Sequence, residues 1–227
     1  MSDYLCEASD GKTYVVKTKS ALTSKAIIAE YTAACLARKL GLPIPHFDIV
    51  YIPNIICQSV KPTWRDHLKE GYAFAIEYIE DATPAKFRQA HGFCDILMQK
   101  EIYLFDFMIK NSDRNLSNRD TGNVNLLFSE SLRKIFLIDH NLAFDNELTD
   151  TDFETHVFSE KNREWVLDLV DRPLMQDKFS KAIRHIDNVF NAIPEEWRPL
   201  DDHDAYLDNI KSTVNRILTV EFWDKIQ

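Results

Sequence analysis

Aspartate and asparagine side chains gather between residues 113 and 139, in a polar loop and around two short apolar runs. Asp113 opens the set and Asp139 ends the second apolar run, with Asn118, Asn123 and Asn125 between them. Carboxylate and amide oxygens suit Mg²⁺, whose sites use only one or two carboxylates beside substrate phosphates. A further aspartate in a loop can orient a hydroxyl nucleophile. The set therefore predicts phosphoryl transfer, with Asp113 at the acceptor and an asparagine and Asp139 at the metal.

These residues also have an ordinary explanation, because aspartate and asparagine are favoured in turns. That explanation accounts for any one of them better than for the ordered set of loop aspartate, asparagine, strand, turn, strand and aspartate. The runs NLLF (125–128) and KIFLID (134–139) are expected to be the two strands of one hairpin. An amide at one end of such a hairpin and a carboxylate at the other can point into one cleft.

A second candidate pair lies closer to the N-terminus. Lys17 ends the β-branched run TYVVK, and Glu30 lies in the first turns of a predicted helix over residues 25–40. In kinase sites a strand lysine contacts the nucleotide phosphates and is held by a helix glutamate. Most strand-end lysines are simply solvated. The prediction that Lys17 and Glu30 belong to a kinase site therefore depends on the aspartate and asparagine set that follows them in the sequence.

The segments that carry Lys17 and Glu30 predict a small sheet with one helix. The expected elements, in order, are a hairpin with its turn at Asp10-Gly11, the helix that Gly41 closes, and strands over 46–53 and 72–80. The sequence DATP after the last strand breaks the pattern. This part of the chain, residues 1–82, is expected to be one lobe.

From about Lys86 the pattern becomes mainly helical, which predicts a second lobe over residues 83–227. A broad apolar face indicates a helix over residues 93–109, before the polar loop and the hairpin. Further helical patterns cover residues 163–172, 176–193 and 204–226. The fold class predicted from these elements is α+β, with a sheet-bearing N-terminal lobe and a mainly helical C-terminal lobe.

Composition describes an ordinary soluble globular protein. The chain has 227 residues, of which 45% are hydrophobic and 28% charged, and this length can bury a substantial core. The formal net charge of −9 disfavours direct nucleic-acid binding, which needs a basic surface. No apolar run has the roughly 18 residues of a membrane helix. The four scattered cysteines are expected to be reduced, so we expect a cytoplasmic protein without membrane contact.

Several stretches resemble the HipA-like kinase family, and together they cover nearly the whole chain. They are YVVKTK, AEYTAACLARKLGLPIPHFDIVYI, NSDRNLSN, NVNLLF and FLIDHNLAFD. That family is similar to the type II phosphatidylinositol kinases in its Asp-Arg-x-x-x-Asn loop and its Ile-Asp strand end. The resemblance implies a two-lobed protein-kinase-like fold, ATP and Mg²⁺ as cofactors, and a serine or threonine hydroxyl of a protein as acceptor. It also implies a toxin-type or regulatory role, with an antitoxin as candidate partner.

The resemblance implies a role for each matching residue. Lys17 would contact the nucleotide phosphates, with Glu30 as its partner. Asp113 would be the catalytic aspartate, Arg114 would brace its loop, and Asp139 would bind metal at the position of the kinase DFG aspartate. For Lys17, Glu30, Asp113 and Asp139 these roles agree with those that the residue types suggest, whereas the role of Arg114 comes from the resemblance alone.

The metal-binding asparagine stays open between three positions. Asn118 has the family's spacing from Asp113, whereas Asn123 and Asn125 directly precede the strand. The stretch RDTGN resembles an insertion between the two features. We favour Asn123 or Asn125, because attachment to a strand fixes a ligand better than a loop does.

One departure from kinase patterns is the missing Gly-x-Gly-x-x-Gly loop over the phosphates. The hydroxyl-rich stretch TKSALTS (18–24) leads into a helix N-terminus and could serve instead. Ser20, Thr23 and Ser24 are therefore candidates for phosphate contact or autophosphorylation. The alternative is that they only cap the helix.

The nucleotide base is expected between the lobes, against the strand FAIEYIE. There the backbone of Glu77, Tyr78 and Ile79 would meet the edge of an adenine. Two other functions remain open at this point: a non-catalytic nucleotide-binding module, which the missing glycine loop suggests, and a small-molecule or lipid kinase. The net charge of −9 and the lack of a basic amphipathic helix count against a membrane lipid.

Overall fold

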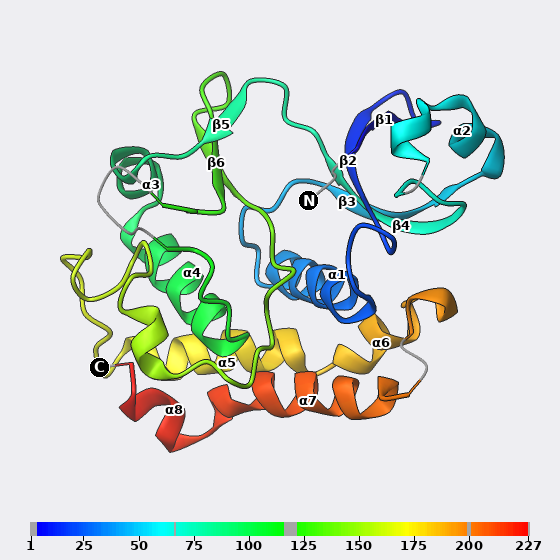
Figure 1. Ribbon diagram of the computed structural model, residues 1–227. Helices are drawn as coiled ribbons and strands as arrows, with labels where there is room; N and C mark the ends of the chain where they lie inside the picture. Colours follow the sequence, from blue (N-terminus) through cyan, green and yellow to red (C-terminus); the bar gives the residue numbers. More distant parts are fainter. Residues whose placement is uncertain (1–3, 66, 116–121, 199–200, 227) are drawn as a thin grey trace.

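The computed structural model describes residues 4–65, 67–115, 122–198 and 201–226, arranged as two lobes (Figure 1). The N-lobe, residues 4–77, is a four-stranded antiparallel sheet in the order β1-β2-β4-β3, with helices on it. Its elements are β1 (Tyr4–Glu7), β2 (Thr13–Thr18), α1 (Ser24–Lys39), β3 (Phe47–Ile52), α2 (Asn54–Ser59), the 3₁₀ turn η1 (Pro62–Trp64) and β4 (Gly71–Glu77). The expected hairpin, helix and two strands are all confirmed.

The register of β2 decides what its side chains face. Tyr14 pairs with Glu77 and Lys17 with Phe74, and successive side chains of a strand point to opposite faces. Val15 and Lys17 therefore share one face of the sheet, the face toward α1. The Asp10-Gly11 turn of the β1–β2 hairpin lies at the opposite end of β2 from Lys17, with Gly11 in the left-handed conformation at φ +78°.

Helix α1 is the most deeply embedded element of the N-lobe. Thr23 caps it by accepting the Ala26 N–H at 3.1 Å, and Gly41, at φ +72°, follows its end. Every residue from 27 to 37 is buried, so no face of this part of the helix meets solvent. One side packs under the sheet, and the other contacts helices of the C-lobe (Figure 1).

The C-lobe, residues 82–226, combines a second small sheet with helices. The sheet is antiparallel in the order β5-β6-β7. The elements are β5 (Ala82–Pro84), α3 (Phe87–Phe93), α4 (Ile96–Met108), β6 (Leu126–Ser129), β7 (Lys134–Leu137), η2 (Asp150–Phe153), α5 (Asp171–Ile183), α6 (Ile186–Asn191), η3 (Glu195–Trp197), α7 (His203–Asn215), η4 (Arg216–Leu218) and α8 (Val220–Asp224). The expected hairpin is β6 and β7. Among the described residues no helix is long and apolar enough to cross a membrane.

Three segments differ from the sequence predictions. The DATP stretch is not only a break, because Ala82–Pro84 pairs with β6 as an edge strand, where a terminal proline is tolerated. The helix expected over 93–109 is α4 and begins only at Ile96, because the Asp95 carboxylate accepts the Met98 N–H and caps it, while Phe93 ends the preceding helix α3. The third is the predicted helix over 163–172, of which only the last two residues are helical.

The segment before α5 stays irregular for a local reason. The Asp168 carboxylate accepts the N–H groups of Val170 at 2.8 Å and Asp171 at 2.9 Å, which closes a turn and places the helix start at Asp171. Of the apolar side chains that suggested a helix, Trp165 packs into the core, whereas most of the others are exposed, Leu169 to 92%. The two remaining predicted helices are each divided in the structure. The helix predicted over 176–193 is interrupted at residues 184–185, and the helix predicted over 204–226 is interrupted at residues 216–219.

The two lobes are joined by hydrogen bonds at both ends of the N-lobe sheet. The Leu137 N–H of β7 donates to the Pro43 carbonyl at 2.7 Å. The indole N–H of Trp197, a fully buried side chain of η3, donates to the Tyr72 carbonyl at 2.9 Å. The lobes consequently share one continuous apolar core that runs from α1 to α8.

Candidate active site

Lys17 is a buried ammonium between two carboxylates. Its Nζ lies 2.7 Å from Asp139 Oδ1 and 3.2 Å from Glu30 Oε2, and the lysine is only 5% exposed. The sequence suggested the Lys17–Glu30 pair from residue types alone, and the structure brings these two together. It also adds Asp139, which lies 122 residues away in the chain.

Glu30 connects the N-lobe to the segment after β7. It is 1% exposed, and its Oε2 accepts the backbone N–H of His140 at 2.8 Å. Burial raises the pKa of Glu30, and the ammonium of Lys17 and this N–H oppose the rise. The position of Asp139 is thereby tied, through the next residue, to the helix that carries Glu30.

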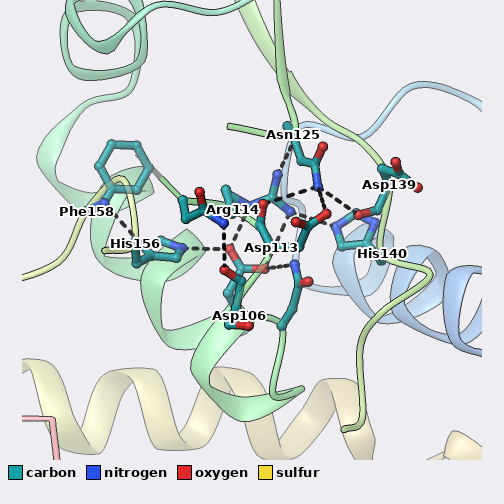
Figure 2. A network of polar contacts seen from close by, with 11 residues as sticks. Asp106, Asp113, Arg114, Asn125, Asp139, His140, His156 and Phe158 are labelled. Carbon is teal, nitrogen blue, oxygen red and sulfur yellow. Dashed lines mark hydrogen bonds and ion pairs between the residues drawn. The ribbon is translucent and has the colours of Figure 1, made fainter. Parts of the chain in front are cut away.

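Asp113 and Asp139 are linked by one asparagine. The Asn125 amide Nδ2 donates to Asp113 Oδ2 at 2.7 Å and contacts the Asp139 carbonyl at 3.4 Å (Figure 2). Asn123 Nδ2 also donates to Asp113 Oδ2, at 2.9 Å. Both asparagines favoured from sequence therefore contact Asp113, and Asn125 alone of the two contacts both aspartates. Asn118 lies outside the described residues.

The backbone at Asn125 and Asp139 is in the left-handed region. Their φ angles are +45° and +57°, a conformation that asparagine and aspartate tolerate better than most residues. The Ile138 N–H donates to the Asn125 carbonyl at 3.1 Å, which holds the two turns together. Unusual backbone conformations at the two candidate metal ligands are a reason to treat both as functional positions.

Arg114 lies at the centre of a buried polar network under these residues (Figure 2). Its Nε donates to Asp106 Oδ2 at 2.6 Å and its Nη2 to His140 Nε2 at 3.0 Å. Its Nη1 donates to the Asn125 carbonyl. The guanidinium is fully buried, and Arg114 connects the loop of Asp113 with the start of β6 and the segment after β7.

Sequence reasoning missed Asp106 and His156 in this network. Asp106 lies in a run of large apolar residues near the end of α4, and His156 is 50 residues further along. The one available signal was the carboxylate itself, since a charged residue on a buried helix face needs a partner. His140, the residue after Asp139, contacts Arg114 in the same network. Burial lowers the pKa of His140 to about 3, so this imidazole is neutral.

A cavity of about 220 Å³ opens between the lobes beside Lys17. Its lining includes the three residues expected at the base: Glu77, Tyr78 and Ile79. Further lining residues are Val15, Lys17, Glu30, Pro45, Ile76, Ala82, Leu127, Ile138 and Asp139. The cavity therefore has apolar walls from both sheets and a charged end formed by Lys17 and its two carboxylates.

The hydroxyl candidates of the 18–24 loop have other contacts. Ser20 Oγ donates to the His67 carbonyl at 2.6 Å, and Ser20 lines a separate hollow with Lys19 and Lys69. Thr23 caps α1, as the alternative interpretation expected. Ser24 is the first residue of that helix. Among the described residues, none of these three lines the cavity that contains Lys17.

The donor set fits a hard divalent cation rather than a thiolate or imidazole metal site. The described residues contain no cluster of three or more His, Cys, Asp and Glu side chains able to hold a metal, and all four cysteines are free thiols. What remains is amide and carboxylate oxygen from Asn125 and Asp139. Such a pair suits Mg²⁺, which relies on substrate phosphates for further ligands.

Comparison with known proteins gives a consistent result. The sequence profile described as HipA-like kinase matches residues 1–226. The crystal structure of the Helicobacter pylori proinflammatory kinase CtkA is similar with a TM-score of 0.58 at 11% identity, covering 99% of this chain and 91% of that one. Shewanella oneidensis HipA, solved with HipB and operator DNA, is similar with a TM-score of 0.50 at 13% identity, covering 94% of this chain and 60% of HipA. No curated protein sequence matches significantly. At these identities the solved structures show a shared fold.

Proposed function

This chain belongs to the HipA-like kinase family, and on that premise we propose that it transfers the γ-phosphoryl group of ATP, with Mg²⁺, to a serine or threonine hydroxyl of a protein. Family membership and the kinase fold give the general class, a kinase-type function. The observation that carries the more specific proposal is the meeting of Lys17, Asp113, Asn125 and Asp139 beside the interlobe cavity.

The cavity is suited to a flat, largely apolar ring. Val15 borders it from the N-lobe sheet, and Leu127 and Ile138 border it from the C-lobe sheet. A base held between these walls would face the chain segment 77–79. The backbone N–H of Ile79 makes no hydrogen bond to any described residue, so it is a donor suited to a ring nitrogen.

The charged end of the cavity is suited to phosphates and a metal ion. Mg²⁺, when bound, would neutralise charge that develops on the transferred phosphoryl group. The Asn125 side-chain carbonyl and the Asp139 carboxylate are the residues that would hold it. The Lys17 ammonium pairs with both Asp139 and Glu30. A cation bound at Asp139 would free the ammonium to pair with a phosphate, and Glu30 would hold Lys17 in position.

Asp113 is oriented for an acceptor hydroxyl. Two amide groups, from Asn123 and Asn125, donate to its Oδ2. Its Oδ1 accepts no hydrogen bond from the described residues, so that oxygen is the one to receive the acceptor proton. The side chain is half-buried, which leaves it within reach of a second molecule.

The test is transfer of label from γ-labelled ATP in Mg²⁺, to the chain itself and to a protein extract. We expect label that disappears in Asp113→Ala, and mapping of the labelled residues would show whether Ser20, Thr23 or Ser24 accepts it. Nucleotide binding without any transfer would favour the non-catalytic module, which the position of the Gly11 turn away from Lys17 also supports. Label on inositol-lipid vesicles but on no protein would instead identify a lipid kinase.

A partner protein of the antitoxin type and a cytoplasmic location are part of the proposal. The support is the solved complex in which HipA is bound to HipB; the described thiols are all free, as expected of a reducing compartment. The chain spans only 60% of that HipA's length, so the partner surface need not be shared. Purification from the native host followed by mass spectrometry tests it, and recovery of the chain alone would contradict it.

A further inference from the structure

Asp106 is a fully buried carboxylate that four donors surround. It lies in the last turn of α4, with 0% exposure. Asn111 Nδ2 and Arg114 Nη2 approach Oδ1 at 2.8 and 3.4 Å, and Arg114 Nε and His156 Nε2 approach Oδ2 at 2.6 and 2.9 Å. Both oxygens are therefore satisfied inside the protein, with α4 as the fixed support.

Through Arg114, this carboxylate acts on three separate segments. Arg114 itself follows Asp113 in the catalytic loop. Its two remaining donors reach the Asn125 carbonyl at the start of β6 and the His140 ring after β7. The three segments that carry Asp113, Asn125 and Asp139 thus share one guanidinium, and Asp106 holds that guanidinium.

His156 attaches a fourth segment to the same carboxylate. The Phe158 N–H donates to His156 Nδ1 at 3.1 Å, so the ring proton is on Nε2 and points to Asp106. The backbone reinforces this contact, because the Val157 N–H donates to the Arg114 carbonyl at 3.1 Å and Asn115 forms a β-bridge with His156. Residues 156–158 consequently lie along the loop that carries Asp113, and none of them lines the interlobe cavity.

The charges in this network are fixed by their surroundings. Burial alone would raise the pKa of Asp106, but the Arg114 guanidinium and the His156 hydrogen bond outweigh it and hold that pKa below its ordinary range. Burial lowers the pKa of His156 despite the nearby carboxylate. The buried unit is therefore an ionised aspartate, a charged arginine and a neutral histidine, with no net charge.

Stability alone is a poor explanation for such a unit. Removing two charges from water is costly, and well-packed apolar side chains often hold a core at least as firmly as a buried ion pair. An apolar cluster, however, could not set the direction of three backbone segments through four directed hydrogen bonds from one side chain, as Arg114 does. What the buried polar network adds over an apolar cluster is a defined orientation of these segments. Orientation matters for catalysis, because misplacement of a reacting group by about 1 Å can lower the rate on the order of 10²-fold.

We propose that Asp106 and His156 are positioning residues that hold Arg114, and through it Asp113, Asn125 and Asp139, in the arrangement needed for phosphoryl transfer. The proposal rests on the proposed function of the same site. Neither residue lines the interlobe cavity or approaches the reacting atoms. Their effect is expected on turnover and on the order of the loop, with nucleotide affinity nearly unchanged.

A matched pair of variants at His156 separates positioning from simple packing. His156→Gln keeps an N–H donor for Asp106, whereas His156→Leu keeps volume and removes the donor. Asp106→Asn tests the charge directly, but it leaves Arg114 without its counterion and can unfold the protein. Ile210→Val, at a buried position of α7 outside the network, controls for a general loss of stability.

Two measurements are made on each full-length variant: turnover with the Kd of Mg²⁺-ATP, and hydrogen–deuterium exchange of peptides covering 111–115, 124–129 and 137–144. We expect His156→Leu to lower turnover by at least about tenfold at similar Kd and to raise exchange in all three peptides together. His156→Gln should keep most of the turnover and most of the protection from exchange in the three peptides. Ile210→Val should change neither the turnover nor the exchange of these peptides.

Three results would contradict the proposal, and each is distinct from a failure of the proposed function. Full turnover in His156→Leu, or lowered turnover with unchanged exchange in the three peptides, overturns the positioning role. Raised exchange confined to residues 156–158 also overturns it, because the segments would then not be coupled. If the unaltered protein transfers no phosphate while the three peptides still respond together, the proposed function fails and the coupled unit stands.

Discussion

At the scale of single residues, the candidate site depends on side chains that each serve two neighbours. Lys17 contacts Glu30 and Asp139, and Asn125 contacts both aspartates. Most of these residues could be predicted from sequence, because the order of loop aspartate, asparagine, strand, turn, strand and aspartate is more specific than any one of these residue types. Asp106 and His156 could not, since a pattern of apolar periodicity carries no signal for two polar groups 50 positions apart that meet inside the core.

The two asparagines that contact Asp113 should differ in their importance. Asn125→Ala removes the one amide that, among the described residues, bridges the two aspartates, and it should weaken Mg²⁺-dependent nucleotide binding by about 10- to 100-fold. Asn123→Ala, the matched control, removes one exposed donor to Asp113 and should leave Mg²⁺ dependence intact while lowering turnover. Titration with Mg²⁺ at fixed ATP analogue measures both. Equal loss of metal affinity in the two variants, or loss only in Asn118→Ala, would contradict the choice of Asn125.

The neutral state of His156 predicts a dependence of stability on pH. Its pKa is lowered in the folded protein, so below about pH 6.5 the unfolded chain takes up a proton that the folded chain excludes. The free energy of unfolding must then fall as the pH falls below that value, by up to about 1.4 kcal/mol per pH unit for this one group. His156→Gln removes the titrating group and keeps the donor, so urea unfolding between pH 7.5 and 5 should show a shallower decline. Parallel declines would argue that His156 is already protonated when folded.

At the scale of elements, the accuracy of the sequence predictions depended on how local the start and stop signals were. Helix α1 was predicted within one residue at each end, because Thr23 and Gly41 act on their own immediate neighbours. The segment before Asp171 was wrongly predicted as helix, because a turn at Asp168 overrode the helical spacing of its apolar residues, of which Trp165 reaches the core and Leu169 is exposed.

Strand β4 begins at a residue whose backbone conformation favours glycine. Gly71 has φ +133°, and a Cβ built on it would lie 2.6 Å from Glu196 Oε1, the carboxylate that accepts the Tyr72 N–H. Gly71→Ala should therefore destabilise the protein by about 1–3 kcal/mol. Gly92→Ala, in α3 with no neighbouring atom within 4 Å, should stabilise it by up to about 1 kcal/mol. Urea midpoints measure both, and an unaffected Gly71→Ala would show that η3 does not contact the sheet in this way.

At the scale of the whole molecule, the two lobes are built as one folding unit. Helix α1 belongs to the N-lobe by sequence, yet it packs against α5, α6 and η3 of the C-lobe. Its N-terminal end is also held, because Tyr206 Oη donates to the Lys25 carbonyl at 3.1 Å and Lys25 pairs with Asp202 at 2.5 Å. Rotation of α1 as a separate body would break several of these contacts at once.

This construction predicts a single cooperative unfolding transition. Far-ultraviolet circular dichroism, which reports all helices, and tryptophan fluorescence should give coincident urea curves, because neither lobe keeps a complete core after the other unfolds. Trp197→Phe keeps the ring packing and removes the hydrogen bond to Tyr72, so it should lower the midpoint of both curves equally. A non-hydrolysable ATP analogue with Mg²⁺ at 100 times its Kd should raise the free energy of unfolding by about 2.7 kcal/mol in both probes. Two separated transitions, with ligand acting on only one, would show that the lobes fold independently and that α1 is free to move with the N-lobe.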